Sequence, residues 1–209
     1  MTHPPTSGVV LAGGLARRMG GVDKMHIRIG GATILRRIIN RLFPQCSAMI
    51  IGGKAEPERL GAIYLPAVVD SIPDRPGPLA GILAGLDGAK LVTRQIDEWM
   101  VSVPSDCPFL PRDLVAKLHE ARIAAGAQLA CASSGGRQHP VVGLWPAALR
   151  EDLRRALTAE GVRKVGEWSA RYTLAVAEWP AAPVDPFFNV NTPEDVAEAE
   201  RLATLYPEA

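Results

Sequence analysis

The chain has 209 residues, 47% of them hydrophobic, and its 23 basic residues against 22 acidic ones leave a formal net charge of +1. That length predicts one well-packed domain, and the balanced charge gives no global field that would favour nucleic acid or a membrane surface as a partner. The polar start at 1–7 argues against a secretory signal, and no apolar stretch is long enough for a membrane span. The three cysteines are widely spaced, which argues against a disulfide framework. Together these features predict a cytoplasmic protein.

Short apolar runs alternate with amphipathic stretches, which is typical of β-α-β units around a mainly parallel sheet with helices on both faces. The predicted strands are 8–11, 48–51, 63–69, 99–103, 128–132 and 141–145. The predicted helices are 33–42, 79–86, 111–125, 147–157 and 192–205. Thr33 and Thr192 supply N-capping hydroxyls, and Pro193 takes the first helical position of the last helix. Residues 178–186, with three prolines, are expected to form an extended connection.

A glycine-rich basic loop, residues 11–24, follows the first predicted strand. Its glycines, Gly13 and Gly14 among them, let backbone N–H groups approach an anion closely. Arg18 and Lys24 add positive charge that meets phosphate oxygens. The spacing fits neither a P-loop nor a dinucleotide fingerprint. The loop therefore predicts a site for a nucleoside triphosphate, the alternative being a surface loop with scattered charges.

Two aspartates lie where predicted strands end, the edge at which open α/β sheets bind ligands. Asp106 follows strand 99–103 and is expected to hold a magnesium ion, which takes one or two carboxylates together with substrate phosphates and waters. The alternative for Asp106 is a turn aspartate between prolines. Asp70 closes strand 63–69 and is expected to accept hydrogen bonds from a nucleobase or ribose, with Gly77 letting a helix start pass close to the nucleotide. The alternative for Gly77-Pro78 is a plain turn into a helix.

Two later segments predict a second substrate site. Residues 135–140, which contain His139, precede one strand, and residues 187–192 precede the last helix. Asn189 and Asn191 alternate in an extended run, so both amides face the same side. The alternatives are a surface turn for the histidine and helix initiation for the second asparagine.

Together the motifs L-A-G-G-x-x-x-R-M-G-G-x-D-K, D-S-x-x-D-x-P-G-P-L-A-G, P-S-D-x-P-x-x-P and F-x-N-V-N-T-P-E-D resemble the molybdenum cofactor guanylyltransferases, in the family's order from Val9 to about Glu198. The opening motif by itself indicates only the larger nucleotidyltransferase superfamily. The resemblance implies a single-domain, three-layer α/β/α nucleotidyltransferase fold of Rossmann-like type over residues 1–209. It further implies that residues from about 8 to 110 hold GTP and magnesium, and that residues from about 111 to 205 form the molybdopterin side.

The implied reaction joins GMP from GTP to the terminal phosphate of molybdopterin and releases pyrophosphate. The resemblance assigns catalysis to Arg18, Lys24 and Asp106, and Mg²⁺ to Asp106. It assigns the GTP site to Leu11, Ala12, Gly13, Gly14, Lys24, Gly52, Asp70, Gly77 and Asp106. It assigns the molybdopterin site to His139, Arg163, Asn189 and Asn191. The chain departs from the family at Gly52, where an asparagine is frequent.

The implied partners are GTP and molybdopterin, with transient contacts to cofactor insertion proteins and apo-molybdoenzymes, and without nucleic acid or membrane. Two alternatives stay open. One is a related nucleotidyltransferase that uses CTP or a sugar-phosphate acceptor. The other is a regulatory protein that binds nucleotide without turnover.

Overall fold

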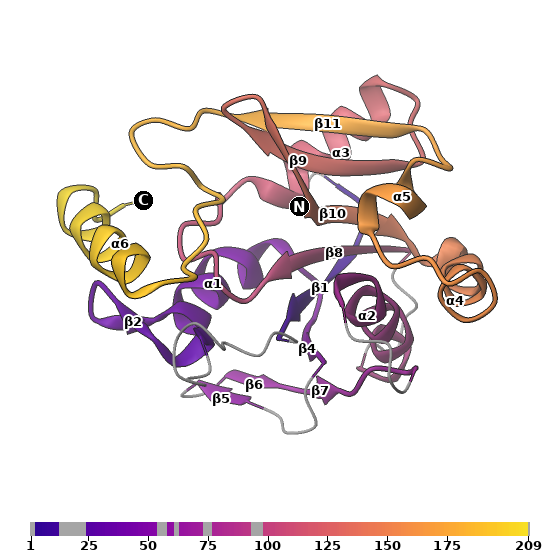
Figure 1. Cartoon of the computed structure of the whole chain (residues 1–209), viewed down its shortest axis with the longest axis horizontal. Helices are drawn as coiled ribbons and strands as arrows, with labels where there is room; N and C mark the ends of the chain where they lie inside the picture. The colour runs from indigo at the N-terminus through magenta and orange to yellow at the C-terminus, as the bar shows by residue number, and fades with distance from the viewer. Residues whose placement is uncertain are drawn as a thin grey trace.

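The computed structural model describes residues 3–12, 24–53, 58–60, 63–72, 77–92 and 98–208. Within these ranges the main sheet has seven strands in the order β11-β9-β10-β8-β1-β4-β7 (Figure 1). The strands are β1 (Thr6–Leu11), β4 (Met49–Gly52), β7 (Ala67–Val68), β8 (Trp99–Pro104), β9 (Leu129–Ser134), β10 (Arg137–Pro146) and β11 (Leu174–Trp179). All pairs are parallel except that β10 is antiparallel to β8 and β9. The start of β10 therefore lies at the edge where the parallel strands end.

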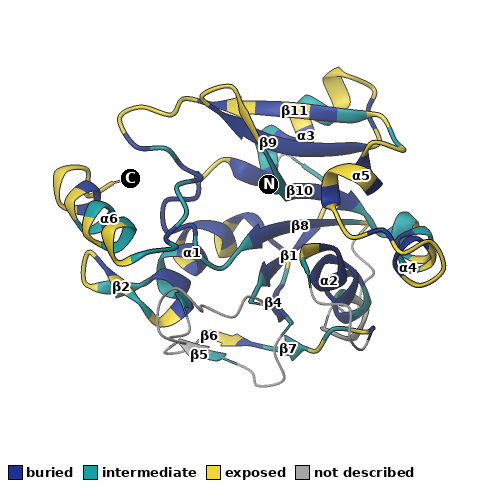
Figure 2. Cartoon of the chain, in the orientation of Figure 1, coloured by how far each residue is buried: buried dark blue, intermediate teal, exposed yellow. Residues whose placement is uncertain are grey.

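The helices of the described chain cover the sheet: α1 (Ile34–Leu42), α2 (Pro78–Val92), α3 (Leu114–Ala124), α4 (Arg150–Thr158), α5 (Val165–Ser169) and α6 (Pro193–Leu205). Successive strand residues point to opposite faces. Val10 packs in one hydrophobic cluster with α1, α3 and α6, and its neighbour Val9 packs in another with α2, α4 and α5. Figure 2 shows the sheet buried between these layers. The predicted three-layer α/β/α architecture with a mainly parallel sheet is confirmed.

Smaller elements complete the described chain. Two short hairpins pair β2 (Arg28–Ile29) with β3 (Ala32–Thr33) and β5 (Glu58–Leu60) with β6 (Ile63–Leu65). Three 3₁₀ turns are η2 (Lys24–His26), η3 (Phe43–Gln45) and η4 (Ala147–Leu149). None of the helices in the described ranges is both long and apolar enough to cross a membrane.

The two predicted N-caps are confirmed. The Thr33 side chain accepts a hydrogen bond from the Arg36 amide at 3.2 Å. Thr192 and Asp195 form a complete capping box, in which each side chain accepts from the other's backbone amide. Because these contacts join residues three apart, local sequence is enough to specify them.

Several predicted elements differ from the structure. The strand expected at 63–69 is wrong as one unit, since Pro66 separates β6 from β7 and these belong to different sheets. Proline lacks the amide proton that would continue the ladder. The extended connection expected at 178–186 begins two residues late, because Glu178 and Trp179 belong to β11. Helix α2 runs on to Val92, past the predicted end at residue 86.

Glycines of α2 explain how closely this helix lies on the sheet. A Cβ atom added at Gly85 would lie 2.8 Å from Sδ of Met100, and one at Gly88 would lie 2.5 Å from Cγ1 of Val68. Real Cβ contacts are not this short, so a side chain at either position would force its neighbour or the helix to shift. At the start of α2, a Cβ atom at Gly81 would lie 2.9 Å from Cδ2 of Leu11, so the start of the helix packs against the carboxyl end of β1.

His119 of α3 is a buried histidine that makes the free energy of unfolding depend on pH. The residue is 1% exposed, and its Nε2 lies 2.9 Å from Oγ1 of Thr6. Burial, with smaller contributions from the nearby charges of His3 and Arg122, lowers the pKa of His119 to about 4. A free histidine has a pKa of about 6.5. Between about pH 4 and pH 6.5, His119 is therefore mostly protonated in the unfolded chain and mostly neutral in the folded protein.

We therefore expect the free energy of unfolding to be fully retained above about pH 7.5 and to fall by about 2 to 3 kcal/mol as the pH drops from there to about 4.5. Urea unfolding at a series of pH values measures this. The His119→Gln variant, whose side chain does not titrate, should lose most of that slope. An unchanged slope in the variant would contradict the assignment.

Candidate active site

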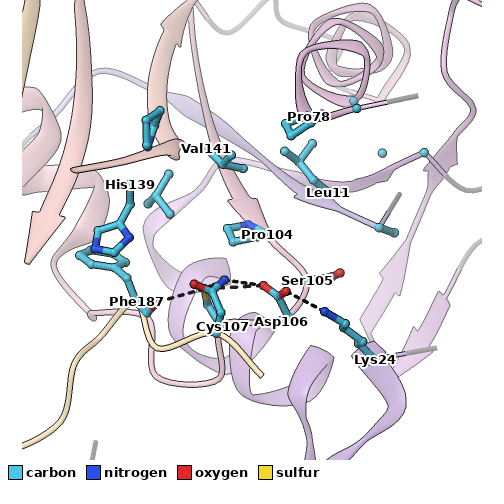
Figure 3. Close-up of a pocket in the computed structure, with 18 of the residues that line it drawn as sticks. Leu11, Lys24, Pro78, Pro104, Ser105, Asp106, Cys107, His139, Val141 and Phe187 are labelled. Atoms are coloured by element: carbon cyan, nitrogen blue, oxygen red, sulfur yellow. Dashed lines mark hydrogen bonds and ion pairs between the residues drawn. The ribbon is translucent and has the colours of Figure 1, made fainter. Parts of the chain in front are cut away.

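A cavity of about 330 Å³ opens at the carboxyl edge of the parallel strands (Figure 3). Its lining comes from the ends of β1, β4 and β8, the start of α2, the start of β10 and the segment before α6. Ligands of open α/β sheets bind at this edge. Of the predicted site residues, the lining includes Leu11, Ala12, Lys24, Gly52, Asp70, Gly77, Asp106, His139 and Asn189.

Asp106 lies in the turn after β8 and joins two side chains from distant parts of the chain. Lys24 Nζ donates to its Oδ2 at 3.3 Å, and Asn189 Nδ2 donates to its Oδ1 at 2.8 Å. The side chains of Lys24 and Asp106 are only 18% and 17% exposed, so this ion pair is partly shielded from solvent. Each carboxylate oxygen still has a lone pair for a further ligand.

Asn191 belongs to the same network. Its Oδ1 accepts a hydrogen bond from Lys24 Nζ, so the lysine joins an aspartate and an amide at once. The Val190 amide also donates to the carbonyl oxygen of Asp106 at 2.9 Å. The predicted nucleotide side and the predicted second-substrate side therefore meet at Asp106.

Asp70 follows β7 and lines the cavity. Its Oδ1 is buried and has no hydrogen-bond partner among the described residues. Burial raises the pKa of this carboxyl group. A shielded acceptor without a donor costs free energy, and a ligand that brings N–H or O–H groups would recover it. Asp70 is thus placed to accept hydrogen bonds from a bound molecule.

The structure explains why glycine stands at position 52. A Cβ atom there would lie 3.0 Å from Cγ2 of Val9 and 3.1 Å from the carbonyl oxygen of Gly81, which belongs to α2. The close approach of α2 therefore fills the space that a side chain would need. The Gly52 carbonyl accepts a hydrogen bond from the Ala12 amide at 2.8 Å. Since glycine has no side chain, this position offers a ligand only backbone surface.

The β9–β10 hairpin supplies one wall of the cavity. Its turn residues Gly135 and Gly136 have φ values of 55° and 75°, the left-handed conformation that a two-residue hairpin requires. The strand register shifts between His139 and Gly143, so residues 140–142 bulge out of the ladder. The bulge lines the cavity together with Arg137, Gln138 and His139. A proline inside a strand pattern, Pro140, is the one sequence signal for it.

Not every predicted site residue lies in the cavity. Gly13, Gly14 and Arg18 fall outside the described residues. Arg163 is exposed between α4 and α5, where it donates to the carbonyl oxygens of Leu157 and Val162 at 3.5 and 3.0 Å, and it is not part of the cavity lining. Its role in substrate binding stays a prediction.

The donor set of the cavity suits a metal ion that arrives with its substrate. Among the described residues, no group of three or more His, Cys, Asp or Glu side chains could hold a metal by itself. The carboxylates among the lining residues are Asp70 and Asp106. Magnesium typically takes one or two carboxylates and completes its shell with phosphate oxygens and waters. Asp106, with lone pairs left on both oxygens, fits that role.

Comparison with known proteins agrees with this geometry. Residues 8–173 match the family model of the MobA-like NTP transferase domain. The molybdenum cofactor guanylyltransferase of Nitrobacter hamburgensis is 57% identical over 202 residues, which cover 97% of this chain and 96% of that protein.

Solved structures share the fold. The molybdopterin-guanine dinucleotide biosynthesis protein A of Archaeoglobus fulgidus superposes with a TM-score of 0.69 at 20% identity, covering 95% of this chain and 99% of that one. The 2-C-methyl-D-erythritol 4-phosphate cytidylyltransferase of Thermus thermophilus gives 0.64 at 19% identity, over 94% and 98% of the two chains. By its sequence and its fold, this chain belongs to the MobA-like NTP transferases and, within them, to the molybdenum cofactor guanylyltransferases.

Proposed function

We propose that the protein transfers GMP from GTP to the terminal phosphate of molybdopterin, forming the guanine dinucleotide cofactor and releasing pyrophosphate. The observation that carries the proposal is a hydrogen-bonded network. Lys24, Asp106 and Asn189 of the cavity lining are linked to one another, and Lys24 also donates to Asn191. The network joins a nucleotide-type loop to the segment before α6, as a reaction between two bound anions requires. The high identity to a molybdenum cofactor guanylyltransferase supports the same reaction.

GTP is proposed to bind at the ends of β1 and β4 and at the start of α2. Leu11, Ala12, Gly52 and Gly77 would contact it through backbone groups and close packing. Gly13, Gly14 and Arg18 are assigned to the same site on the family resemblance alone.

Asp70 supports guanine over cytosine. Guanine presents two adjacent donor groups, N1–H and the 2-amino group, whereas the pairing edge of cytosine presents one amino group. A carboxylate accepts two parallel hydrogen bonds, so guanine would satisfy Asp70 better. A buried acceptor left unpaired penalises the wrong base.

Molybdopterin is proposed to bind on the side of β10 and the segment before α6. His139 lines that side, and Asn189 Oδ1 and Asn191 Nδ2 are the amide atoms not used in the network with Lys24 and Asp106. Arg163 is included on the resemblance alone. Its exposed position makes a contact with the outer part of the acceptor the simplest role.

The chemistry requires positioning more than proton transfer. The acceptor phosphate is already anionic, so its oxygen attacks the α-phosphorus without a general base. The new P–O bond forms as the bond to the β-phosphate breaks, and the electron pair leaves with pyrophosphate. Mg²⁺ held by Asp106 would neutralise phosphate charge when bound. Lys24 would stabilise the charge that grows on the departing group, and the two walls of the cavity would align both anions.

A transfer assay with purified protein, Mg²⁺ and molybdopterin tests the proposal by measuring pyrophosphate release from GTP and from CTP. We expect GTP to be preferred by about 100-fold or more in kcat/KM. A preference for CTP would favour a related cytidylyltransferase. Magnesium-dependent GTP binding without product would favour a regulatory protein. The cytoplasmic location and the contacts with cofactor insertion proteins and apo-molybdoenzymes remain predictions.

A further inference from the structure

Three side chains form a hydrogen-bonded chain behind the acceptor wall of the cavity. His139 Nε2 lies 2.8 Å from Ser134 Oγ, and Ser134 Oγ lies 2.8 Å from Asp185 Oδ1. Ser134 is the last residue of β9 and is only 3% exposed. Asp185 comes from the segment between β11 and α6. These hydrogen bonds therefore connect the β9–β10 hairpin to the segment that leads to Asn189.

The directions of these two hydrogen bonds define the tautomer of His139. A serine hydroxyl has one proton, and the carboxylate of Asp185 only accepts, so Ser134 donates to Asp185. Ser134 must then accept from His139, and Nε2 of the imidazole carries the proton. Nδ1 is left as an acceptor in the neutral ring, and it makes no hydrogen bond to any described residue. A partner on one ring nitrogen thus decides what the other nitrogen offers to a ligand.

Asp185 holds a second part of the same wall. Its Oδ1 also accepts from the Phe187 amide at 2.9 Å, and the Phe187 ring lies 4.7 Å from the His139 ring between centroids. At the other end of this segment, Asn189 donates to Asp106. In Figure 3, Asp106 lies between Lys24 on one side and His139 and Phe187 on the other. One carboxylate oxygen therefore aligns both rings of the wall.

We infer that Ser134 and Asp185 are positioning residues for the acceptor substrate. They hold His139 as the Nε2–H tautomer, so that Nδ1 accepts from an N–H group of a pterin, and they hold the Phe187 ring beside it. This inference rests on the proposed function, because it takes molybdopterin as the molecule that meets this wall. It assigns the two residues no contact with GTP.

The Ser134→Ala variant tests the inference in the transfer assay. We expect KM for molybdopterin to rise about tenfold, with KM for GTP within about twofold of wild type, because only the acceptor wall loses its alignment. Asp185→Ala should behave in the same way. Asp185→Asn retains an oxygen that accepts from both Ser134 and Phe187, so it should restore most of the acceptor affinity lost in Asp185→Ala.

Ser133→Ala is the matched control. Ser133 is the preceding residue of β9, is 2% exposed, and hydrogen-bonds to β11 rather than to the cavity wall. The control should lose a similar amount of thermal stability and leave KM for molybdopterin unchanged. If Ser134→Ala fails to fold, the two Asp185 variants decide the question.

The outcomes separate this inference from the proposed function. Absence of transfer by the wild-type protein with either nucleotide would overturn the proposed function itself. Normal wild-type transfer, combined with an unchanged KM for molybdopterin in Ser134→Ala and Asp185→Ala, would overturn only the positioning role. So would an equal rise in KM for both substrates, or a rise in the Ser133→Ala control as large as that in Ser134→Ala.

Discussion

The Asp106→Asn variant is expected to fold normally and to transfer GMP about 10³-fold more slowly than wild type, or worse. The substitution keeps the shape of the side chain, and the hydrogen bond from the Val190 amide goes to the Asp106 backbone. What is lost is the negative charge between Lys24 and Asn189 and, with it, the carboxylate proposed to hold Mg²⁺. Initial rates of pyrophosphate release at saturating GTP and molybdopterin measure the effect.

Asp113→Asn is a suitable control for this experiment. Asp113 precedes α3 and accepts a hydrogen bond from Trp179 Nε1 at 2.9 Å, outside the cavity lining. It should cost some stability and leave transfer intact. If metal binding is the role of Asp106, raising Mg²⁺ should restore part of the activity of Asp106→Asn, and the metal concentration at half-maximal rate should increase. Near wild-type transfer by Asp106→Asn at low Mg²⁺ would remove this residue from the reaction.

Local patterns predicted that Asp70 and Asp106 would lie at one edge of the sheet. Asp70 and Asp106 each follow a strand, and the carboxyl ends of parallel strands share one edge, so their approach to a common cavity follows from the fold class. The network around Lys24 was only partly predictable, because its lysine and aspartate are 82 residues apart and its link to Asn191 spans 167. Contacts between residues so far apart in the sequence depend on how α6 packs against the rest of the domain. No local sequence pattern specifies that packing.

Features that depend on strand pairing were missed for the same reason. β11 alternates buried Ala175, Ala177 and Trp179 with more exposed neighbours, but two of its three buried residues are alanines and give little hydrophobic contrast. The bulge at 140–142 is a shift in the register of β10 against β9, so it is defined only by the pairing of the two strands. Ser134 pairs with Trp179 at the end of β11, and Asp185 follows that strand, so their contact emerges only in the assembled sheet.

The Lys24→Met variant is expected to lower kcat/KM by about 10² to 10³-fold, because it removes the charge while keeping an unbranched stem in the cavity. Lys24 is the basic lining residue whose ammonium group contacts Asp106 and Asn191 at once. Lys24→Arg keeps the charge, but its planar group does not reproduce two contacts made from one nitrogen, so it should recover only part of the rate. Full activity in Lys24→Met would contradict the role of the lysine.

A double-mutant cycle with Asn191→Ala shows whether the lysine acts through both halves of the site. If its contact with Asn191 aligns the acceptor side with Asp106, removing either partner disrupts the same arrangement, and the two losses in kcat/KM should not add. The shortfall in the double variant should be about tenfold or more. Strict additivity would mean that Lys24 acts on the triphosphate alone and that the asparagine binds the acceptor independently. The coupled result is the one expected from a single ammonium group that joins the two segments.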